Sequence, residues 1–160
     1  MKNILLMSFC AAALLASACG KDDDNGTKTP SNDGSFVGTL DVAPMEGSHF
    51  TAFSEKDITF EMKEQNGGMY TLFMPKIKFV EQMPVYISFE VRSLKPVFDG
   101  EGYKFSVAET LPYRNGAVYV PDGDGKYTIR NMQGENVNGT TLQVTFECYG
   151  MTVDYTGTKK

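Results

Sequence analysis

The residue with the most informative chemistry is Cys19, because its surroundings fit covalent lipid attachment. Lys2 gives a basic start, an apolar stretch of about twelve residues runs from Ile4 to Leu15, and the small residues Ala16–Ala18 follow. A signal peptide has this layout, and the stretch is well short of the roughly 20 residues that span a bilayer. A cysteine directly after the small residues predicts a bacterial lipoprotein whose mature chain begins at a lipidated Cys19. The alternative is ordinary secretory cleavage near Ala18, which leaves a free thiol.

This interpretation divides the chain into a signal peptide (1–18), the lipidated cysteine with a flexible linker (19–34) and one domain (35–160). The linker is rich in Gly, Asp, Asn, Ser and Thr, which is typical of a disordered spacer. Its run Lys21–Asp24 is similar to the signal that exports Bacteroidetes lipoproteins to the cell surface; the alternative is a plain solvated linker. We therefore expect an outer-membrane protein, held by acyl chains and exposed at the cell surface.

Charge and cysteine content exclude several partners and cross-links. The formal net charge is −5, and no basic cluster interrupts the domain, so nucleic acid is not an expected partner. Cys10 leaves with the signal and Cys19 takes the lipid, so Cys148 has no partner for an intramolecular disulfide. Cys148 alternates with apolar residues, which predicts a buried and inert thiol.

Residues that could build an active site or a metal site do not assemble into a motif. Asp122–Gly125 has two carboxylates, but the twelfth position of a calcium-binding loop would be Gln133, and Asp and Gly are also the residues of tight turns. His49 has no Cys or His at zinc-ligand spacing. Three glutamates fall on the polar faces of separate strands: Glu61, Glu90 and Glu147. We therefore expect no enzyme activity, no metal and no cofactor.

The elements that position these residues are strands, because apolar and polar residues alternate from Ser35 onward. Asn66-Gly67 predicts a type I′ hairpin. Pro75 is expected to end or kink a strand. No stretch has a helical apolar period. The expected strands are 36–42, 57–63, 69–74, 76–80, 85–92, 103–107, 116–120, 127–132, 141–149 and 151–156.

About eight short antiparallel strands allow either a barrel or a sandwich. The first and last strands have similar lengths and both carry Gly and Thr near their centres, which favours a barrel closed by pairing between them. A membrane-spanning barrel is disfavoured, because its strands need about 9–11 residues and an outward apolar band.

Short segments in a fixed order resemble a known family. They are Tyr70–Met74, Lys78-Phe79, Met83-Pro84, Gly150–Val153 and Tyr155–Thr158. Together with the lipoprotein signal, they resemble the calycin-like β-barrel domain found in Bacteroidetes lipoproteins, over most of 35–160. The resemblance implies an all-β fold, an eight-stranded antiparallel up-and-down barrel similar to lipocalins. It implies no functional residues, and the chain lacks the Gly-x-Trp signature of ordinary lipocalins.

The inward-facing apolar residues are the set with a functional interpretation: they either line a ligand cavity or fill the core. An eight-stranded barrel is just wide enough for either. Several inward phenylalanines favour filling, with a shallow cup at one open end. The set is Ile58, Phe60, Met62, Leu72, Ile87, Phe89, Val91, Phe105, Val107, Leu142, Val144 and Phe146.

Three functions from different classes fit these features. The first is a surface lipoprotein whose barrel binds a small apolar or amphipathic ligand. The second is a protein-binding or inhibitor module with a packed barrel, for which an exposed aromatic patch around Tyr86, Tyr113 and Tyr119 would be the sign. The third is an accessory glycan-binding lipoprotein, against which the absence of tryptophan counts.

Surface exposure is tested by adding proteinase K to intact cells that express the full chain. We expect the protein to be degraded, as followed by immunoblot, because the linker holds the domain outside the outer membrane. Complete protection in intact cells, with degradation after lysis, would place the protein in the periplasm instead.

Overall fold

The computed structural model describes residues 31–121 and 123–160, so the predicted signal peptide, Cys19 and most of the linker lie outside the described residues. The described part is all-β, as predicted, and contains no helix that could cross a membrane. Its strands are β1 (Gly34–Pro44), β2 (Phe53–Gln65), β3 (Met69–Ile77), β4 (Ile87–Leu94), β5 (Val97–Phe98), β6 (Gly102–Thr110), β7 (Tyr113–Arg114), β8 (Ala117–Val118), β9 (Ile129–Val137), β10 (Thr141–Cys148) and β11 (Met151–Lys159).

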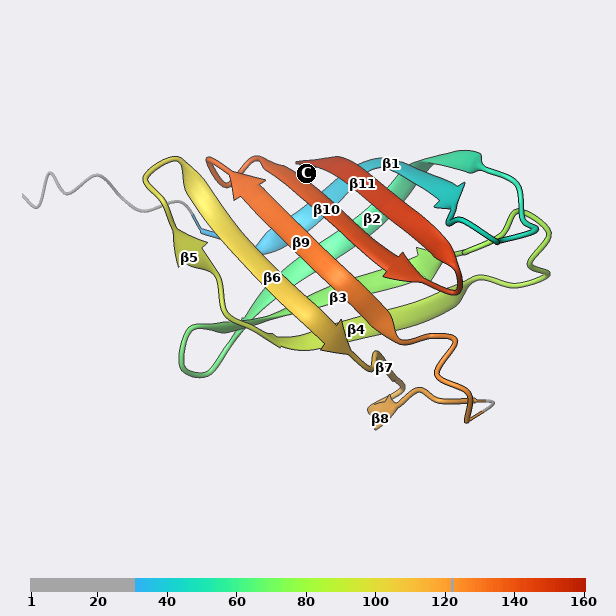
Figure 1. Ribbon diagram of the computed structural model, residues 1–160. Helices are drawn as coiled ribbons and strands as arrows, with labels where there is room; N and C mark the ends of the chain where they lie inside the picture. The colour runs from blue at the N-terminus through green and yellow to red at the C-terminus, as the bar shows by residue number, and fades with distance from the viewer. Residues whose placement is uncertain (1–30, 122) are drawn as a thin grey trace, which may run out of the picture.

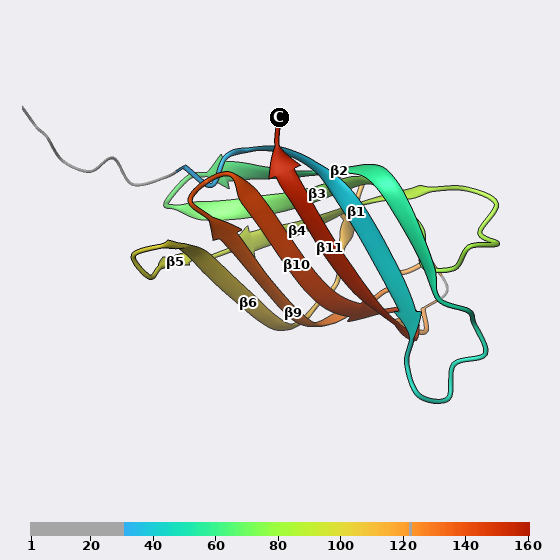
Figure 2. The same cartoon turned by 90° about the horizontal axis from the view of Figure 1, so that it is seen from above.

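All eleven strands belong to one antiparallel sheet, in the order β5-β6-β9-β10-β11-β1-β2-β3-β4-β7-β8. The sheet curls into a half-barrel around the core, with β3 and β4 facing β9 and β10 across it (Figures 1 and 2). The first and last long strands pair over their whole length, from Phe36 opposite Lys159 to Pro44 opposite Met151. The predicted pairing of the two ends of the domain is therefore confirmed, whereas the predicted closed barrel is not, because the described sheet is a half-barrel. β4 and β6 lie near each other, but no strand ladder joins them in the described residues.

Period-two alternation explains why these segments are strands. In β10, Leu142, Val144, Phe146 and Cys148 are buried, while the residues between them are exposed or half-buried. Successive side chains of a strand point to opposite faces, so this alternation separates an apolar inner face from a polar outer face. The same pattern in β11 and β3 adds to one continuous apolar core.

Tyr155 connects three strands inside the core. Its ring stacks on Phe60 at a centroid distance of 3.8 Å. Its hydroxyl lies 2.7 Å from the carbonyl oxygen of Phe36 and 3.2 Å from that of Ile58, beside a register shift between β1 and β2. Burial raises the pKa of Tyr155 from its ordinary value near 10 to about 12. The hydroxyl therefore remains a donor below about pH 10, and its stabilising effect is lost as the pH rises through 12.

Two glycines make room for aromatic rings on the inner face. A Cβ on Gly157 would collide with the Tyr155 hydroxyl, and a Cβ on Gly134 would collide with the ring of Phe105, its cross-strand neighbour. An aromatic side chain that packs over a strand glycine restores the contacts that the glycine lacks. These pairs fill the interior with rings while keeping the strands close together.

The structure corrects the expected number and ends of the strands. There are eleven strands, not about eight, because β5, β7 and β8 are two-residue strands that alternation cannot detect. β9 extends to Val137, beyond the expected end at residue 132, and β8 covers only two of the residues expected from 116 to 120. β3 includes Pro75 and ends at Ile77, and a register shift with β4 between Met74 and Ile77 accommodates the proline.

Two local predictions are also wrong. The hairpin at Asn66-Gly67 exists, but positive φ occurs at Gly67 and Gly68, in a three-residue connection between Gln65 and Met69. A two-residue type I′ turn is therefore absent there. Val85 was expected to begin the strand 85–92, but β4 begins only at Ile87, and Val85 is 58% exposed.

We expect Tyr155→Phe to lower the free energy of unfolding by about 1–3 kcal/mol, because it removes the single buried O–H donor that the carbonyls of Phe36 and Ile58 share. Urea unfolding followed by circular dichroism measures the change. Tyr103→Phe is the matched control, since the structure records no hydrogen bond from its hydroxyl within the described residues. Equal stability of the two variants would show that the Tyr155 hydroxyl is not needed.

Candidate functional site

The interior of the curled sheet is filled by side chains. Eleven of the twelve residues expected to face inward are buried, and the twelfth, Val107, is partly buried against the same core. The rings of Phe60, Phe89 and Phe146 have no exposed surface. The hollows described below open at the surface instead, where loops or outer faces meet.

One end of the sheet carries the longer connections, and we call it the loop end. The segments 45–52, 78–86 and 123–128 and the turn Tyr149-Gly150 meet there, at the right of Figure 1. Three of the eight exposed large apolar side chains lie in these segments: Phe50, Val85 and Tyr86. Three more lie in the connection between β6 and β9, whose Tyr119 contacts Tyr127: Leu111, Val118 and Val120.

Six aromatic side chains cover the core at the loop end, and we call them the aromatic cluster: Phe50, Phe79, Phe89, Tyr119, Tyr127 and Tyr149. Phe79 and Phe89 are fully buried, and their rings lie 5.7 Å apart. Tyr127 contacts Tyr149 at 5.2 Å, and Tyr149 contacts Phe50 at 5.9 Å. The cluster therefore leads from the fully buried core to the exposed ring of Phe50.

Tyr149 occupies a strained turn position. It and Gly150 form the two-residue connection between β10 and β11, with φ of 57° and 71°. Positive φ at both positions favours Asn or Gly, and a bulky residue is uncommon there. The contacts of its ring with Phe50, Phe79 and Tyr127 give a reason for tyrosine at this position. Strain of this kind is concentrated at binding sites.

A hollow of about 520 Å³ lies beside this turn, and we call it the loop-end hollow. Its apolar wall consists of Met45, Phe50, Cys148 and Tyr149. The polar groups come from the last connection before β9 and from the adjoining ends of β9 and β10: Asp124, Lys126, Arg130 and Glu147. Its size falls within the range of pockets that hold small molecules, and an apolar wall with a few polar groups is their usual composition.

The charged groups of the loop-end hollow are held by short contacts. Lys126 Nζ lies 2.8 Å from Asp124 Oδ2, and this contact lowers the pKa of Asp124 below its ordinary value. Arg130 Nε donates to Glu109 at 3.0 Å. Glu147 stands opposite Arg130 in the strand register and accepts a hydrogen bond from an asparagine amide. Two positive and two negative groups thus line the hollow.

A second hollow of about 430 Å³ adjoins the first and shares lining residues with it. Phe50 and Tyr149 line both hollows, and the loop from Met45 to His49 completes the second one. His49 is exposed, as expected for a histidine in a loop. The two hollows therefore meet around these two rings.

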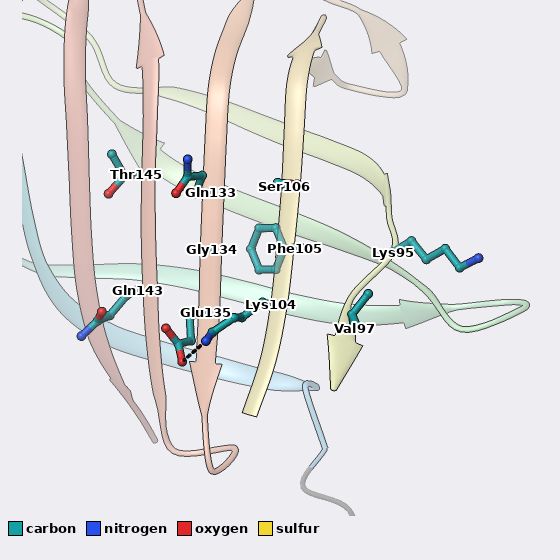
Figure 3. A pocket seen from close by; sticks show the side chains of 10 residues that line it. All are labelled: Lys95, Val97, Lys104, Phe105, Ser106, Gln133, Gly134, Glu135, Gln143 and Thr145. Carbon is teal, nitrogen blue, oxygen red and sulfur yellow. Dashed lines mark ion pairs between the residues drawn. The ribbon is translucent and has the colours of Figure 1, made fainter. Parts of the chain in front are cut away.

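The outer face of β6, β9 and β10 forms a wider trough of about 660 Å³ (Figure 3). Outward side chains line it, including Lys104, Gln133, Glu135, Gln143 and Thr145. Lys104 lies 3.7 Å from Glu135 and 2.7 Å from Asp99, which lowers the pKa of that aspartate to about 2.

The trough lacks the composition of a small-molecule site. Its side chains are the polar half of the strand alternation, and Phe105 faces the core behind Gly134. Only Val97 adds an exposed apolar side chain. The loop-end hollow has aromatic rings in its wall, one of them the exposed ring of Phe50, so we take it as the candidate site.

Other candidate residues from the sequence remain apart. Each glutamate of the scattered set has its own partner: Glu61 contacts Lys63, Glu90 contacts Arg92 and Glu147 contacts Asn131. Gly123 and Gly125 have φ of 68°, as a turn requires, while Asp122 lies outside the described residues. No group of three or more His, Cys, Asp or Glu able to hold a metal occurs in the part of the chain that the structure describes.

Among the described residues, no ring contact is recorded between any two of the three tyrosines proposed as one patch, although Tyr113 pairs with Val118 and so lies near Tyr119. Tyr119 joins the aromatic cluster, but no recorded ring contact joins Tyr86 or Tyr113 to it. Lys76 and Lys78 lie over the ring of Tyr86 at 4.1 and 4.4 Å, and the Arg92 guanidinium lies over Tyr113. Of the aromatic cluster, Phe89 and Tyr119 were among the predicted residues. The other four lie outside the strands, where alternation does not predict contacts: Phe50, Phe79, Tyr127 and Tyr149.

Comparison with known proteins identified no relative: neither a family model, nor a curated protein, nor a solved structure matches this chain.

We expect Cys148 to resist alkylation by iodoacetamide at pH 8 in the folded protein and to react fully in urea. The thiol is 3% exposed, and burial raises its pKa above the ordinary value, so the reactive thiolate is scarce. Peptide mass spectrometry resolves this cysteine from the others. Rapid modification of Cys148 in the native protein would contradict this expectation, because it would show that the Cys148 thiol is accessible from the loop-end hollow.

Proposed function

We propose that this chain is a lipid-anchored protein of the bacterial cell envelope that holds a small amphipathic molecule at its loop end. The observation that carries the proposal is the loop-end hollow, an aromatic and polar site of ligand size beside a filled interior. The ligand would contact the outer surface of the aromatic cluster, which differs from binding within the barrel.

The proposed lipid anchor and the proposed type of barrel are supported by features of the sequence. The apolar stretch before Cys19 supports lipid attachment, and the polar linker supports a surface location. The eight strands of eight or more residues, with the first paired to the last, are compatible with a calycin-like up-and-down barrel. In this arrangement the linker joins the domain near Gly34, away from the loop end, which leaves the hollow facing outward.

Protein binding through the same end is the second candidate. Exposed apolar side chains at the loop end, such as Leu111, Val118 and Val120, favour it. Patches of this kind mark interaction sites when they are contiguous. Such a partner would cover the rim of the hollow, whereas a small molecule would enter it.

The proposal is tested with N-phenyl-1-naphthylamine, a neutral amphipathic dye whose fluorescence rises in an apolar site. We expect the full chain, purified in detergent, to bind it above a detergent blank, and Phe50→Ala to weaken binding about tenfold, because losing a ring contact costs about 1.4 kcal/mol.

Phe98→Ala is the matched control, since Phe98 is as exposed as Phe50, at 41%, but lies on β5 at the opposite end. Native mass spectrometry then asks whether a molecule co-purifies with the unmodified protein and is lost with Phe50→Ala. Equal dye binding by both variants, with no co-purified molecule, would refute a small-molecule site at the loop end.

A further inference from the structure

We propose that the loop between β1 and β2, residues 45–52, is a lid that opens and closes the loop-end hollow. This inference rests on the function proposed above and adds how access to that site is controlled. It follows from a loop that is fixed at both ends, weakly held between them, and closed over the hollow by the ring of Phe50.

Both ends of the lid are joined to neighbouring strands. Just after β1, the Met45 N–H donates a hydrogen bond to the Gly150 carbonyl oxygen at 3.0 Å. At the other end, Phe53 begins β2 and pairs with Val42 of β1. Movement is therefore restricted to the residues between Met45 and Phe53, and these two positions act as hinges.

The residues between the two hinges are weakly held. The Ser48 N–H donates to the Met45 carbonyl oxygen at 3.0 Å and closes a tight turn, in which Gly47 has a φ of 82°. The Ser48 hydroxyl lies 3.7 Å from Met151 Sδ, which is a weak acceptor. Among the described residues, no backbone–backbone hydrogen bond is recorded for residues 49–52, and all four are exposed. Exposed backbone and few buried apolar contacts mark the segments of a fold that open most readily.

One aromatic contact closes the lid. Phe50 stacks on Tyr149 at 5.9 Å and keeps 41% of its surface exposed, whereas Tyr149 also stacks on the fully buried Phe79 at 6.2 Å. Because separating one exposed ring contact costs little free energy, we expect the open form to be populated at roughly 1–10%. Phe50 and Tyr149 line both hollows, so withdrawal of Phe50 would join the two hollows and admit a ligand.

The other two loops at this end are more firmly fixed to the core. In the segment 78–86, Phe79 is fully buried. In the segment 123–128, the Lys126 carbonyl oxygen accepts a hydrogen bond from the Tyr149 N–H at 2.9 Å, and Thr128 is buried. Residues 45–52 are therefore the loop that can move without separating buried side chains.

The first test is nuclear magnetic resonance relaxation dispersion on the isotope-labelled full chain in detergent, with and without N-phenyl-1-naphthylamine. We expect microsecond-to-millisecond exchange in residues 46–52 of the free protein, because the lid opens and closes on that timescale. Bound dye is expected to suppress the exchange, since its contact with Phe50 favours the closed lid. The segment 78–86 is the internal reference and is expected to show no such exchange.

The second test compares two glycine variants by stopped-flow measurement of dye release. A side chain at positive φ is unfavourable, so Gly47→Ala is expected to loosen the turn of the lid and to release dye about fivefold faster. Gly67→Ala is the matched control and is expected to release dye at the unmodified rate. Gly67 has a φ of 80°, a Cβ at either glycine would meet nothing within 4 Å, and Gly67 lies between β2 and β3 at the opposite end.

Three outcomes would overturn the lid while dye binding still depends on Phe50: no exchange in residues 46–52, exchange that the dye leaves unchanged, or equal release rates from the two glycine variants. The hollow would then be a small-molecule site with open access, and the proposed function would stand. If dye binding does not depend on Phe50, the proposed function fails and the lid fails with it.

Discussion

The rest of the structure depends on a continuous core of buried side chains inside the curled sheet. Tyr155 shows how this is reached: its ring stacks on Phe60 while its hydroxyl supplies a donor to the carbonyls of Phe36 and Ile58. Because Gly157 has no side chain, the tyrosine can lie along β11 and reach both neighbouring strands. One buried side chain thereby joins the first and last parts of the domain and fills its centre.

Because buried side chains fill the interior, a ligand has to bind at the surface of the domain. Strand alternation leaves mostly polar side chains on the outer face, so a cluster of aromatic side chains near the surface is more readily built from residues outside that alternation. The loop end supplies it, through the exposed ring of Phe50 and the turn residue Tyr149. The ring contacts of Tyr149 offset the cost of holding this residue at positive φ. The same side chain therefore lines the loop-end hollow and covers the end of the core.

The sequence predicted those features of the fold that follow from the period-two alternation of apolar and polar residues. It gave the all-β class, the pairing of the first and last strands and the buried environment of residues such as Phe146. It did not give the two-residue strands or the ends of β4 and β9, because short pairings depend on neighbours distant in sequence. Phe50 and Phe79 lie in irregular segments, so their meeting with Tyr127 and Tyr149 depends on how three loops fold over one end.

The central claim is that ligands bind outside a filled interior, at the loop end. Nuclear magnetic resonance of the isotope-labelled full chain in detergent, titrated with N-phenyl-1-naphthylamine, tests it most directly. The account predicts that the signals of Phe50, Tyr149 and Gly150 shift while those of Phe60, Val144 and Phe146 stay in place. Shifts concentrated on the interior residues would contradict it, because they would place the ligand inside the curled sheet.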